Sequence, residues 1–199
     1  MVTEIELKAH VRDSEALRLL LAEKAEYLGS FEKNDTYWSN DKINFGEIHP
    51  GVPGLPPSGL RVRTENRVLP DGTNMEATFA TYKNKEVRDG IEINNEQEFE
   101  VRSRSCHSIP VFEDFLRRIG LKPGAAKKKR GWAFSYEGIT VELLEVESLG
   151  WFVELEIIAD NNREETFARG KQRLLDFLAT IGIAKEAIES RFYSEMLNC

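Results

Sequence analysis

The stretch Thr3-Glu4-Ile5-Glu6-Leu7-Lys8, near the start of the chain, decides how the rest of the sequence is interpreted. Its apolar residues alternate with charged ones, which is the two-residue period of a β-strand rather than the period of a helix. On such a strand Glu4, Glu6 and Lys8 share one face, and Ile5 and Leu7 share the other. A single stretch of this kind is usually a half-buried strand with a solvated charged face, so the pattern gains meaning only where later strands repeat it.

Most of the later strands repeat this alternation, with charges on one face and Val, Ile, Leu or Phe on the other. The expected strands cover residues 31–39, 60–64, 75–84, 96–102, 127–136, 139–146 and 151–158. The acids collected from all strands are Glu4, Glu6, Glu96, Glu98, Glu100, Glu142, Glu154 and Glu156. The bases are Lys8, Arg61, Arg63, Lys83, Lys128 and Arg130. On the strand 127–136, Lys128, Arg130 and Trp132 are expected to share one face.

Helices and loops are expected between these strands. A helix begins at Asp13 or Ser14 and runs to about Leu28, where Gly29 ends it. Further helices are predicted for residues 109–119, from 161 or 162 to 181, and from 185 to 197. The polar stretch 84–95 is predicted to be connecting structure, and the Pro- and Gly-rich stretch 45–59 a long loop, either a lid or a rim. No tandem repeat or low-complexity linker divides the chain, so a single domain over residues 1–199 is the simplest organisation.

Composition and charge exclude several classes of protein. With 41% hydrophobic and 31% charged residues, the chain has the balance of a soluble globular protein. It has no apolar run of membrane-spanning length and begins with acidic residues, so we expect a cytoplasmic protein. Its net charge of -7 argues against general nucleic-acid binding, so an anion site requires a local concentration of Lys and Arg. Cys106 and Cys199 do not form a disulfide framework, and the histidines lack metal-ligand spacing.

Two arrangements are compatible with the repeated charged face. In an open sheet the charges face water. In a closed barrel they face inward, and the apolar faces point outward beneath the helices. Burying charges is costly unless they are paired or hydrated, but the closed arrangement has an evident use. Paired carboxylates bind hard divalent cations such as Mg²⁺ or Mn²⁺, and several Arg and Lys side chains can clamp a polyphosphate.

Several stretches, in their order and spacing, resemble the CYTH or triphosphate tunnel metalloenzyme superfamily. The matching pieces are Glu4-Ile5-Glu6-Leu7-Lys8, Leu60-Arg61-Val62-Arg63, Thr81-Tyr82-Lys83, Lys128-Lys129-Arg130 and Val146-Glu147-Ser148-Leu149-Gly150-Trp151-Phe152-Val153-Glu154-Leu155-Glu156. The ending Arg191-Phe192-Tyr193-Ser194-Glu195-Met196-Leu197 is similar to that of the bacterial class IV adenylate-cyclase-type branch. One position departs from the family pattern, because Leu144 stands where the family usually has an aspartate, and Glu142 lies two residues earlier on the same face.

The resemblance implies an α+β fold: an eight-stranded antiparallel β-barrel, or triphosphate tunnel, with helices packed on the outside. It also implies Mg²⁺ or Mn²⁺ bound by Glu4, Glu6, Glu142, Glu154 and Glu156. The residues implied to bind the triphosphate are Lys8, Arg61, Arg63, Lys83, Lys128 and Arg130, and among them Lys8, Lys83 and Arg130 are implied to take part in catalysis.

Three activities remain open at the level of sequence. The preferred one is a class IV adenylate cyclase, which converts ATP to cyclic AMP and pyrophosphate. The second is a phosphohydrolase acting on inorganic, thiamine or nucleoside triphosphate, and the third is a non-catalytic binder of polyphosphate or nucleotide. In each case the expected partner is a small triphosphate-containing molecule, with neither nucleic acid nor membrane, and the resemblance allows a homodimer.

Overall fold

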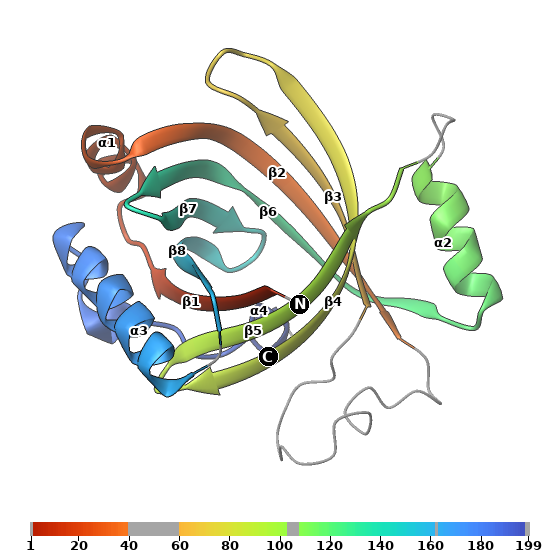
Figure 1. The fold of residues 1–199 in the computed structure, drawn as a ribbon. Helices are drawn as coiled ribbons and strands as arrows, with labels where there is room; N and C mark the ends of the chain where they lie inside the picture. Colours follow the sequence, from red (N-terminus) through yellow and green to blue (C-terminus); the bar gives the residue numbers. More distant parts are fainter. Residues whose placement is uncertain (1, 40–59, 103–107, 162, 198–199) are drawn as a thin grey trace.

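A computed structural model describes residues 2–39, 60–102, 108–161 and 163–197. Its strands are β1 (Val2–His10), β2 (Glu26–Ser39), β3 (Leu60–Val68), β4 (Asn74–Arg88), β5 (Ile91–Glu100), β6 (Lys122–Tyr136), β7 (Ile139–Val146) and β8 (Gly150–Ala159). They form a closed antiparallel barrel in the order β1-β5-β4-β3-β2-β6-β7-β8 (Figure 1). Strand β1 closes the barrel by pairing with both β5 and β8, and Glu6 lies opposite Glu92 on one side and Glu156 on the other.

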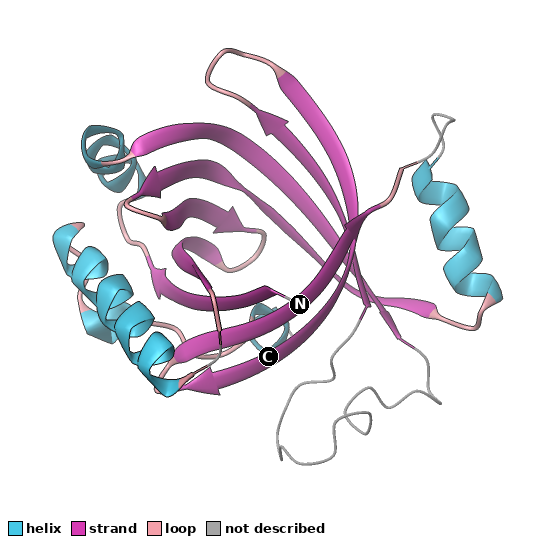
Figure 2. Cartoon of the chain, in the orientation of Figure 1, coloured by secondary structure: helices cyan, strands magenta, loops and turns pink. Residues whose placement is uncertain are grey.

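Helices lie on the outside of this barrel (Figure 2). They are α1 (Ser14–Lys24), α2 (Ser108–Arg118), α3 (Glu164–Thr180), the short 3₁₀ helix η1 (Lys185–Ala187) and α4 (Tyr193–Leu197). The Asp13 side chain caps α1 by accepting a hydrogen bond from the backbone N–H of Ala16 at 3.0 Å. Within the described ranges, no helix has the length and apolar character needed to cross a membrane.

The largest hydrophobic core lies between the outer face of the barrel and the helices α1 and α3. Ile5 and Leu7 of β1 are fully buried there, in one cluster with Leu17 of α1 and with Leu174 and Phe177 of α3. Helix α3 approaches β1 closely at Gly170, where a Cβ atom would lie 2.6 Å from Ile5 Cδ1. The charged face of β1 therefore points inward, as predicted, and the closed arrangement with an inverted core is confirmed.

Several predicted boundaries were wrong. Helix α1 ends at Lys24 rather than near Leu28, because β2 already begins at Glu26. Gly29 does not end the helix but lies within β2 at φ 119°, where a Cβ atom would clash with the backbone oxygen of Val68 at 2.2 Å. Glycine is required at this position because β2 approaches the end of β3 closely, and not because a helix ends there.

The polar stretch 84–95 forms strand rather than connecting structure. Strand β4 continues to Arg88, and β5 starts at Ile91 after a tight turn in which Asp89 and Gly90 both have positive φ. The predicted helix 185–197 is divided into η1 and α4, with extended chain between them. The predicted loop 45–59 lies outside the described residues.

Candidate active site

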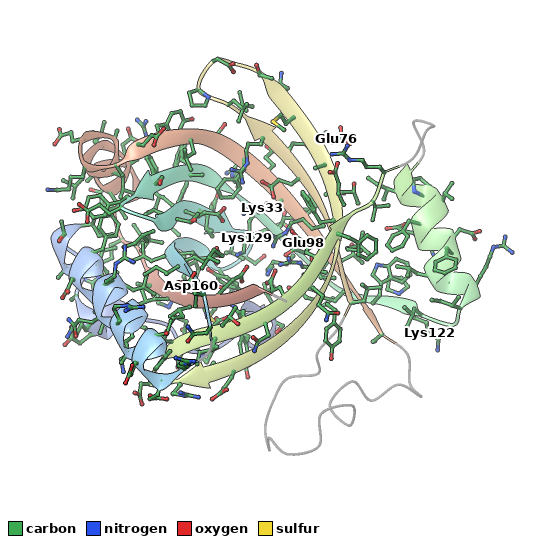
Figure 3. All side chains as sticks on the ribbon, in the orientation of Figure 1. Lys33, Glu76, Glu98, Lys122, Lys129 and Asp160 are labelled. Carbon is green, nitrogen blue, oxygen red and sulfur yellow. The ribbon has the colours of Figure 1, made fainter. Side chains whose placement is uncertain are left out.

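The inner faces of the strands surround a cavity of about 390 Å³, a volume within the roughly 300–1,000 Å³ of small-molecule sites. Lys33, Lys129 and Glu98 are among the side chains directed toward the centre of the barrel in Figure 3. The charged residues lining the cavity are Glu4, Glu6, Lys33, Arg61, Arg63, Glu92, Glu96, Glu98, Lys127, Lys129, Glu142, Glu154 and Glu156. All of these acids come from β1, β5, β7 and β8, and the bases come from β2, β3 and β6.

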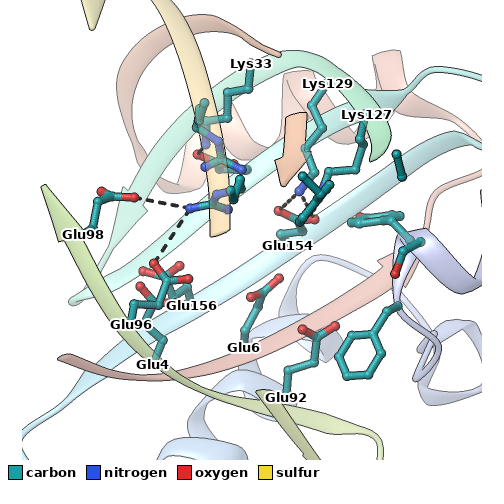
Figure 4. A pocket seen from close by; sticks show the side chains of 18 of the residues that line it. Glu4, Glu6, Lys33, Glu92, Glu96, Glu98, Lys127, Lys129, Glu154 and Glu156 are labelled. Atoms are coloured by element: carbon teal, nitrogen blue, oxygen red, sulfur yellow. Dashed lines mark hydrogen bonds and ion pairs between the residues drawn. The ribbon is translucent and has the colours of Figure 1, made fainter. Parts of the chain in front are cut away.

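Three carboxylates on the acidic side are close enough to share one ion. Glu4 and Glu6 of β1 and Glu156 of β8 each offer an oxygen, and the three oxygens lie within 4.8 Å of one another (Figure 4). An all-oxygen donor set of this charge suits a hard divalent cation such as Mg²⁺ or Mn²⁺. The structure thus brings together three of the five acids that were predicted to bind metal.

The other two predicted metal ligands are paired with lysines. Glu154 of β8 accepts hydrogen bonds from Lys129 Nζ at 2.6 and 2.9 Å. Burial opposes the ionisation of Glu154, but Lys129 outweighs it and lowers the pKa of this carboxyl. Glu142 of β7 forms an ion pair with Lys33 of β2. Both glutamates line the same cavity as Glu4, Glu6 and Glu156, although neither belongs to that cluster.

The basic side is organised around Asp35, a residue that the sequence analysis did not select. In the register of β2, Asp35 lies opposite Arg63 of β3 and Lys127 of β6. Its carboxylate accepts hydrogen bonds from Arg63 at 2.6 and 3.0 Å and lies 3.3 Å from Lys127 Nζ. The Asp35 side chain is fully buried. Burial alone would raise its pKa, but Arg63 and Lys127 lower that pKa well below its ordinary value.

Arg61 and Arg63 point into the cavity, as predicted. Arg61 Nη2 donates a hydrogen bond to Thr81 Oγ1 at 3.0 Å and to Glu98 at 3.3 Å, and lies 3.9 Å from Glu96. The Nε of Arg61 is buried without a hydrogen-bond partner. Arg61 therefore lines the cavity with its guanidinium held by side chains of β4 and β5.

The prediction that Lys128 and Arg130 line the interior was wrong by one residue. Their side chains are 63% and 70% exposed on the outer surface, paired with Glu147 and Glu145. Their neighbours Lys127 and Lys129 point inward instead. Lys128, Arg130 and Trp132 do share one face, but Trp132 stacks on Trp151 on the outside, with ring centroids 5.6 Å apart.

A sequence signal for this register was present in the residues that follow. Gly131 continues the inward face of β6, and a Cβ atom there would lie 2.1 Å from the backbone oxygen of Leu143 on β7. Small residues fit that close approach, whereas the bulky Trp132 and Phe134 fit the outer core. Because Trp132 and Phe134 face outward, the two-residue period continued back along the strand places Lys127 and Lys129 on the inner face.

Lys8 lies deep in the barrel and is paired with Glu92 of β5, and both side chains are almost inaccessible to solvent. Beside them, Asn94 donates a hydrogen bond to Glu6 at 2.8 Å. Lys83 belongs to β4 opposite Glu96, but its side chain lies outside what the structure describes. Lys8 therefore has a defined place within the barrel, and the role predicted for Lys83 stays a prediction.

An apolar cluster fills the barrel beyond this charged region. It consists of Phe31, Ala133, Leu144, Val146, Phe152 and Tyr193. Leu144, at the position where the family pattern has an aspartate, is fully buried in this cluster, whereas Glu142 on the same strand lines the cavity. The change from acid to leucine thus lies where the interior becomes apolar.

The closed antiparallel barrel, with opposed acidic and basic side chains inside and its core outside, defines a charged-tunnel protein. A model of the CYTH domain matches residues 2–193, so the chain belongs to the CYTH domain family. That family contains adenylate cyclases and triphosphatases, so this is a family of enzymes. A search of curated proteins found no match.

Solved structures share this fold. The PH1819 protein from Pyrococcus horikoshii is 24% identical with a TM-score of 0.77, and the alignment covers 98% of each chain. A Vibrio parahaemolyticus protein described as a “putative adenylate cyclase” is 18% identical with a TM-score of 0.75, again over 98% of each chain. HpAC1 from Hippeastrum, described as having a dominant triphosphatase activity, is 17% identical with a TM-score of 0.64, over 99% of this chain and 94% of its own.

Proposed function

We propose that the protein is a metal-dependent enzyme that converts a triphosphate inside the barrel. One observation carries the proposal: a single cavity holds the Glu4–Glu6–Glu156 cluster and, among its basic residues, Arg61, Arg63 and Lys129. A triphosphate bound with divalent cations presents both signs of charge to its site, with phosphate oxygens for arginine and lysine and cations for carboxylates. The cavity offers both sets of partners within one small volume.

Glu4, Glu6 and Glu156 would hold the cation, with Glu154 and Glu142 nearby. A bound Mg²⁺ or Mn²⁺ supplies charge neutralisation of the phosphate oxygens and lowers the pKa of an oxygen nucleophile. In the structure these carboxylates project from adjacent, hydrogen-bonded strands, so their backbone positions are fixed before any ligand arrives. Such preorganisation is what makes electrostatic stabilisation effective in an enzyme.

Arg61, Arg63, Lys127 and Lys129 would bind the phosphate oxygens and stabilise the charge that develops on the leaving group. Arg63 and Lys127 share Asp35, so together these three groups carry one net positive charge toward the cavity. Arg61 lies on the same side of the cavity and is paired with Glu98. The site is therefore electropositive on this side, and none of the four cations is an isolated buried charge, because Lys129 is paired with Glu154. An isolated buried charge would be strongly disfavoured.

Cyclisation of a nucleoside triphosphate is the first of two reactions that fit this site. The ribose 3′-oxygen would attack the α-phosphorus, the bond from that phosphorus to the bridging oxygen would break, and pyrophosphate would leave with the bond electrons. The 3′-hydroxyl proton would pass to solvent. This reaction requires room for a nucleoside, and Tyr37, Trp38, Gly124 and Ala125 give the cavity an aromatic and apolar surface beside Lys127.

Hydrolysis is the second reaction, and the dominant triphosphatase activity of the similar HpAC1 supports it. Water would attack the terminal phosphorus, the bond from that phosphorus to the bridging oxygen would break, and the diphosphate part would leave with the bond electrons. A proton of the attacking water would pass to solvent, and orthophosphate would be released. The same carboxylates and bases serve both reactions, because both displace an oxygen leaving group at phosphorus. The two reactions differ in the nucleophile, a ribose hydroxyl or water, and in the phosphorus atom that it attacks.

Product analysis separates the two reactions. The protein is incubated with Mg²⁺ or Mn²⁺ and, in separate samples, with ATP, inorganic triphosphate or thiamine triphosphate. Cyclic AMP with pyrophosphate identifies a cyclase, and orthophosphate identifies a hydrolase. Binding without turnover of any triphosphate identifies a non-catalytic binder and contradicts the proposal.

A matched pair of variants tests the acidic cluster. The double substitution Glu4→Gln and Glu6→Gln should abolish metal-dependent turnover while the far-ultraviolet circular dichroism spectrum stays that of a folded barrel. Glu145→Gln, on the outer face of β7, should retain full activity because Glu145 pairs with Arg130 on the surface. Full activity in the double variant would contradict the metal-site assignment.

A further inference from the structure

Tyr193, in the C-terminal segment, is folded into the barrel and has no role in the reactions proposed above. Glu189 fixes this segment to β1: its backbone N–H donates to the Lys8 carbonyl at 2.9 Å, and Ala9 and Ile188 form an isolated β-bridge. The Glu189 carboxylate also accepts a hydrogen bond from Arg191 at 2.7 Å. The chain then carries Tyr193 into the interior, where it is 7% exposed and lines the cavity.

Three lysine ammonium groups surround the Tyr193 ring. The distance from Nζ to the ring centroid is 4.6 Å for Lys129, 5.2 Å for Lys127 and 5.5 Å for Lys8. These lysines come from β1 and β6, which are not neighbours in the barrel. The ring of Phe152 meets Tyr193 edge-on at 5.1 Å and fixes its orientation. One aromatic ring thus contacts cations from two separate strands.

We propose that Tyr193 is a positioning residue whose ring, fixed beside the buried Lys8, holds Lys127 and Lys129 at the inner end of the triphosphate site. This inference rests on the proposed function, since it assigns Lys127 and Lys129 to phosphate binding. An aromatic face attracts ammonium groups within about 6 Å of its centroid. The ring carries no charge, so it can hold several cations together without neutralising them.

A neutral ring has an advantage over a carboxylate at this place. In the structure Lys129 is paired with Glu154 and Lys127 with Asp35. A bound phosphate must take lysine donors away from such carboxylates, and at that moment the lysines repel one another. The ring of Tyr193 keeps its contact with each ammonium group throughout, because it uses no hydrogen bond that the phosphate needs. Tyr193 therefore holds the lysine side chains in place before the phosphate binds, which lowers the entropy cost of ordering them on binding.

Removal of the ring should weaken ground-state binding and leave the chemical step unchanged. In Tyr193→Leu, we expect the KM for the triphosphate and the Kd for inorganic tripolyphosphate to rise by about tenfold, which corresponds to cation–π contributions of partly buried groups. The value of kcat should change by less than about twofold, the signature of uniformly lost binding. Tyr193→Phe retains the ring and should restore both constants to within about twofold of the wild type.

Tyr136→Leu is the matched control. Tyr136 stacks on Phe177 at 4.4 Å outside the cavity, so its loss removes an aromatic ring without affecting the lysines. Calorimetric titration of the full-length proteins with inorganic tripolyphosphate and Mg²⁺ supplies the binding constants. Equal Kd values for Tyr193→Leu and Tyr136→Leu would overturn the inference, as would a loss in Tyr193→Phe as large as that in Tyr193→Leu.

A nuclear magnetic resonance measurement tests the inference without any ligand. The ε-methylene protons of Lys129, assigned by comparison with a Lys129→Arg spectrum, should be shifted upfield by the ring current in the wild type and in Tyr193→Phe. No upfield shift in the wild type would overturn the inference even if Tyr193→Leu does not fold. If the wild type shows the shift but binds no tripolyphosphate, the proposed function fails while the lysine–ring arrangement stands.

Discussion

Substitution of Asp35 by asparagine provides the sharpest test of how the basic side of the cavity is held together. The Asp35 carboxylate is fully buried and bonded to Arg63, with Lys127 Nζ at 3.3 Å. Asparagine has nearly the same shape but no charge, so two buried cations lose their shared anion. Removing one partner of a buried ion pair costs about 3–5 kcal/mol. Because asparagine retains one acceptor oxygen, we expect a loss near the lower limit, about 3 kcal/mol.

The measurement is the free energy of unfolding in urea at pH 7 for the wild type, Asp35→Asn and the control Glu32→Gln. Glu32 lies on the same strand but is exposed, so its substitution should change stability by less than about 0.5 kcal/mol. For a domain of this size, a loss of 3 kcal/mol lowers the melting temperature by about 6–12 °C.

The sign of the pH effect follows from the lowered pKa of Asp35. Its stabilising contribution is complete above the ordinary carboxyl range and disappears as the pH falls through the lowered value. Inorganic tripolyphosphate should stabilise Asp35→Asn by more than it stabilises the wild type, because it replaces the missing anion. A loss below 1 kcal/mol, or equal stabilisation of both proteins by tripolyphosphate, would refute this reasoning.

Three further predictions concern the register, the C-terminal segment and the packing of β6. Lys129→Met should lower kcat/KM for the triphosphate at least about 100-fold, whereas the outward-facing Lys128→Met should stay near wild type in the same steady-state assay. Hydrogen bonds from Arg191 lower the pKa of Glu189 to about 2. Glu189→Gln should therefore lose about 1–3 kcal/mol at pH 7, and urea titrations at lower pH should show this difference shrinking as the pH falls below about 4.5 toward 2. Gly131→Ala would place a Cβ atom 2.1 Å from the Leu143 oxygen. The melting temperature of this variant should fall by several degrees, since each kcal/mol of lost stability lowers it by about 2–4 °C in a domain of this size. An unchanged melting temperature would contradict the close approach of β6 and β7.

The alternation of charge along β1 and β8 left an open sheet and a closed barrel possible, and the resemblance to the CYTH family selected the closed barrel with its inverted core. Ile5 and Leu7 do pack outward beneath α3, and Glu4, Glu6 and Glu156 do converge inside. This success has a physical basis, because a closed barrel is the arrangement that lets a charged strand face avoid both the core and the bulk solvent.

The failure at β6 also has a physical basis. Polarity does not alternate within the four consecutive basic residues Lys127 to Arg130, so this run alone cannot assign a face, and only the following Trp132 and Phe134 could have done so. Asp35 was missed for a different reason. Its partners Arg63 and Lys127 lie on two other strands, and only the pairing of β2 with β3 and β6 makes them neighbours. Tyr193 likewise enters the site through the path of the C-terminal segment, which strand periodicity does not report.

The wall of this barrel is a single layer of backbone, which has a consequence for the lengths of its strands. Along β1, each residue that lines the cavity is followed by one that belongs to the outer core. An insertion or deletion of one residue near the middle of β1 would move the glutamates on one side of it into the apolar layer and the aliphatic residues into the cavity. Such changes should be excluded within the strands and collect in the hairpins, whereas the identities of cavity residues can vary one at a time. The residues that line the cavity can therefore change only by substitution, because packing of the outer core fixes which positions of each strand face inward.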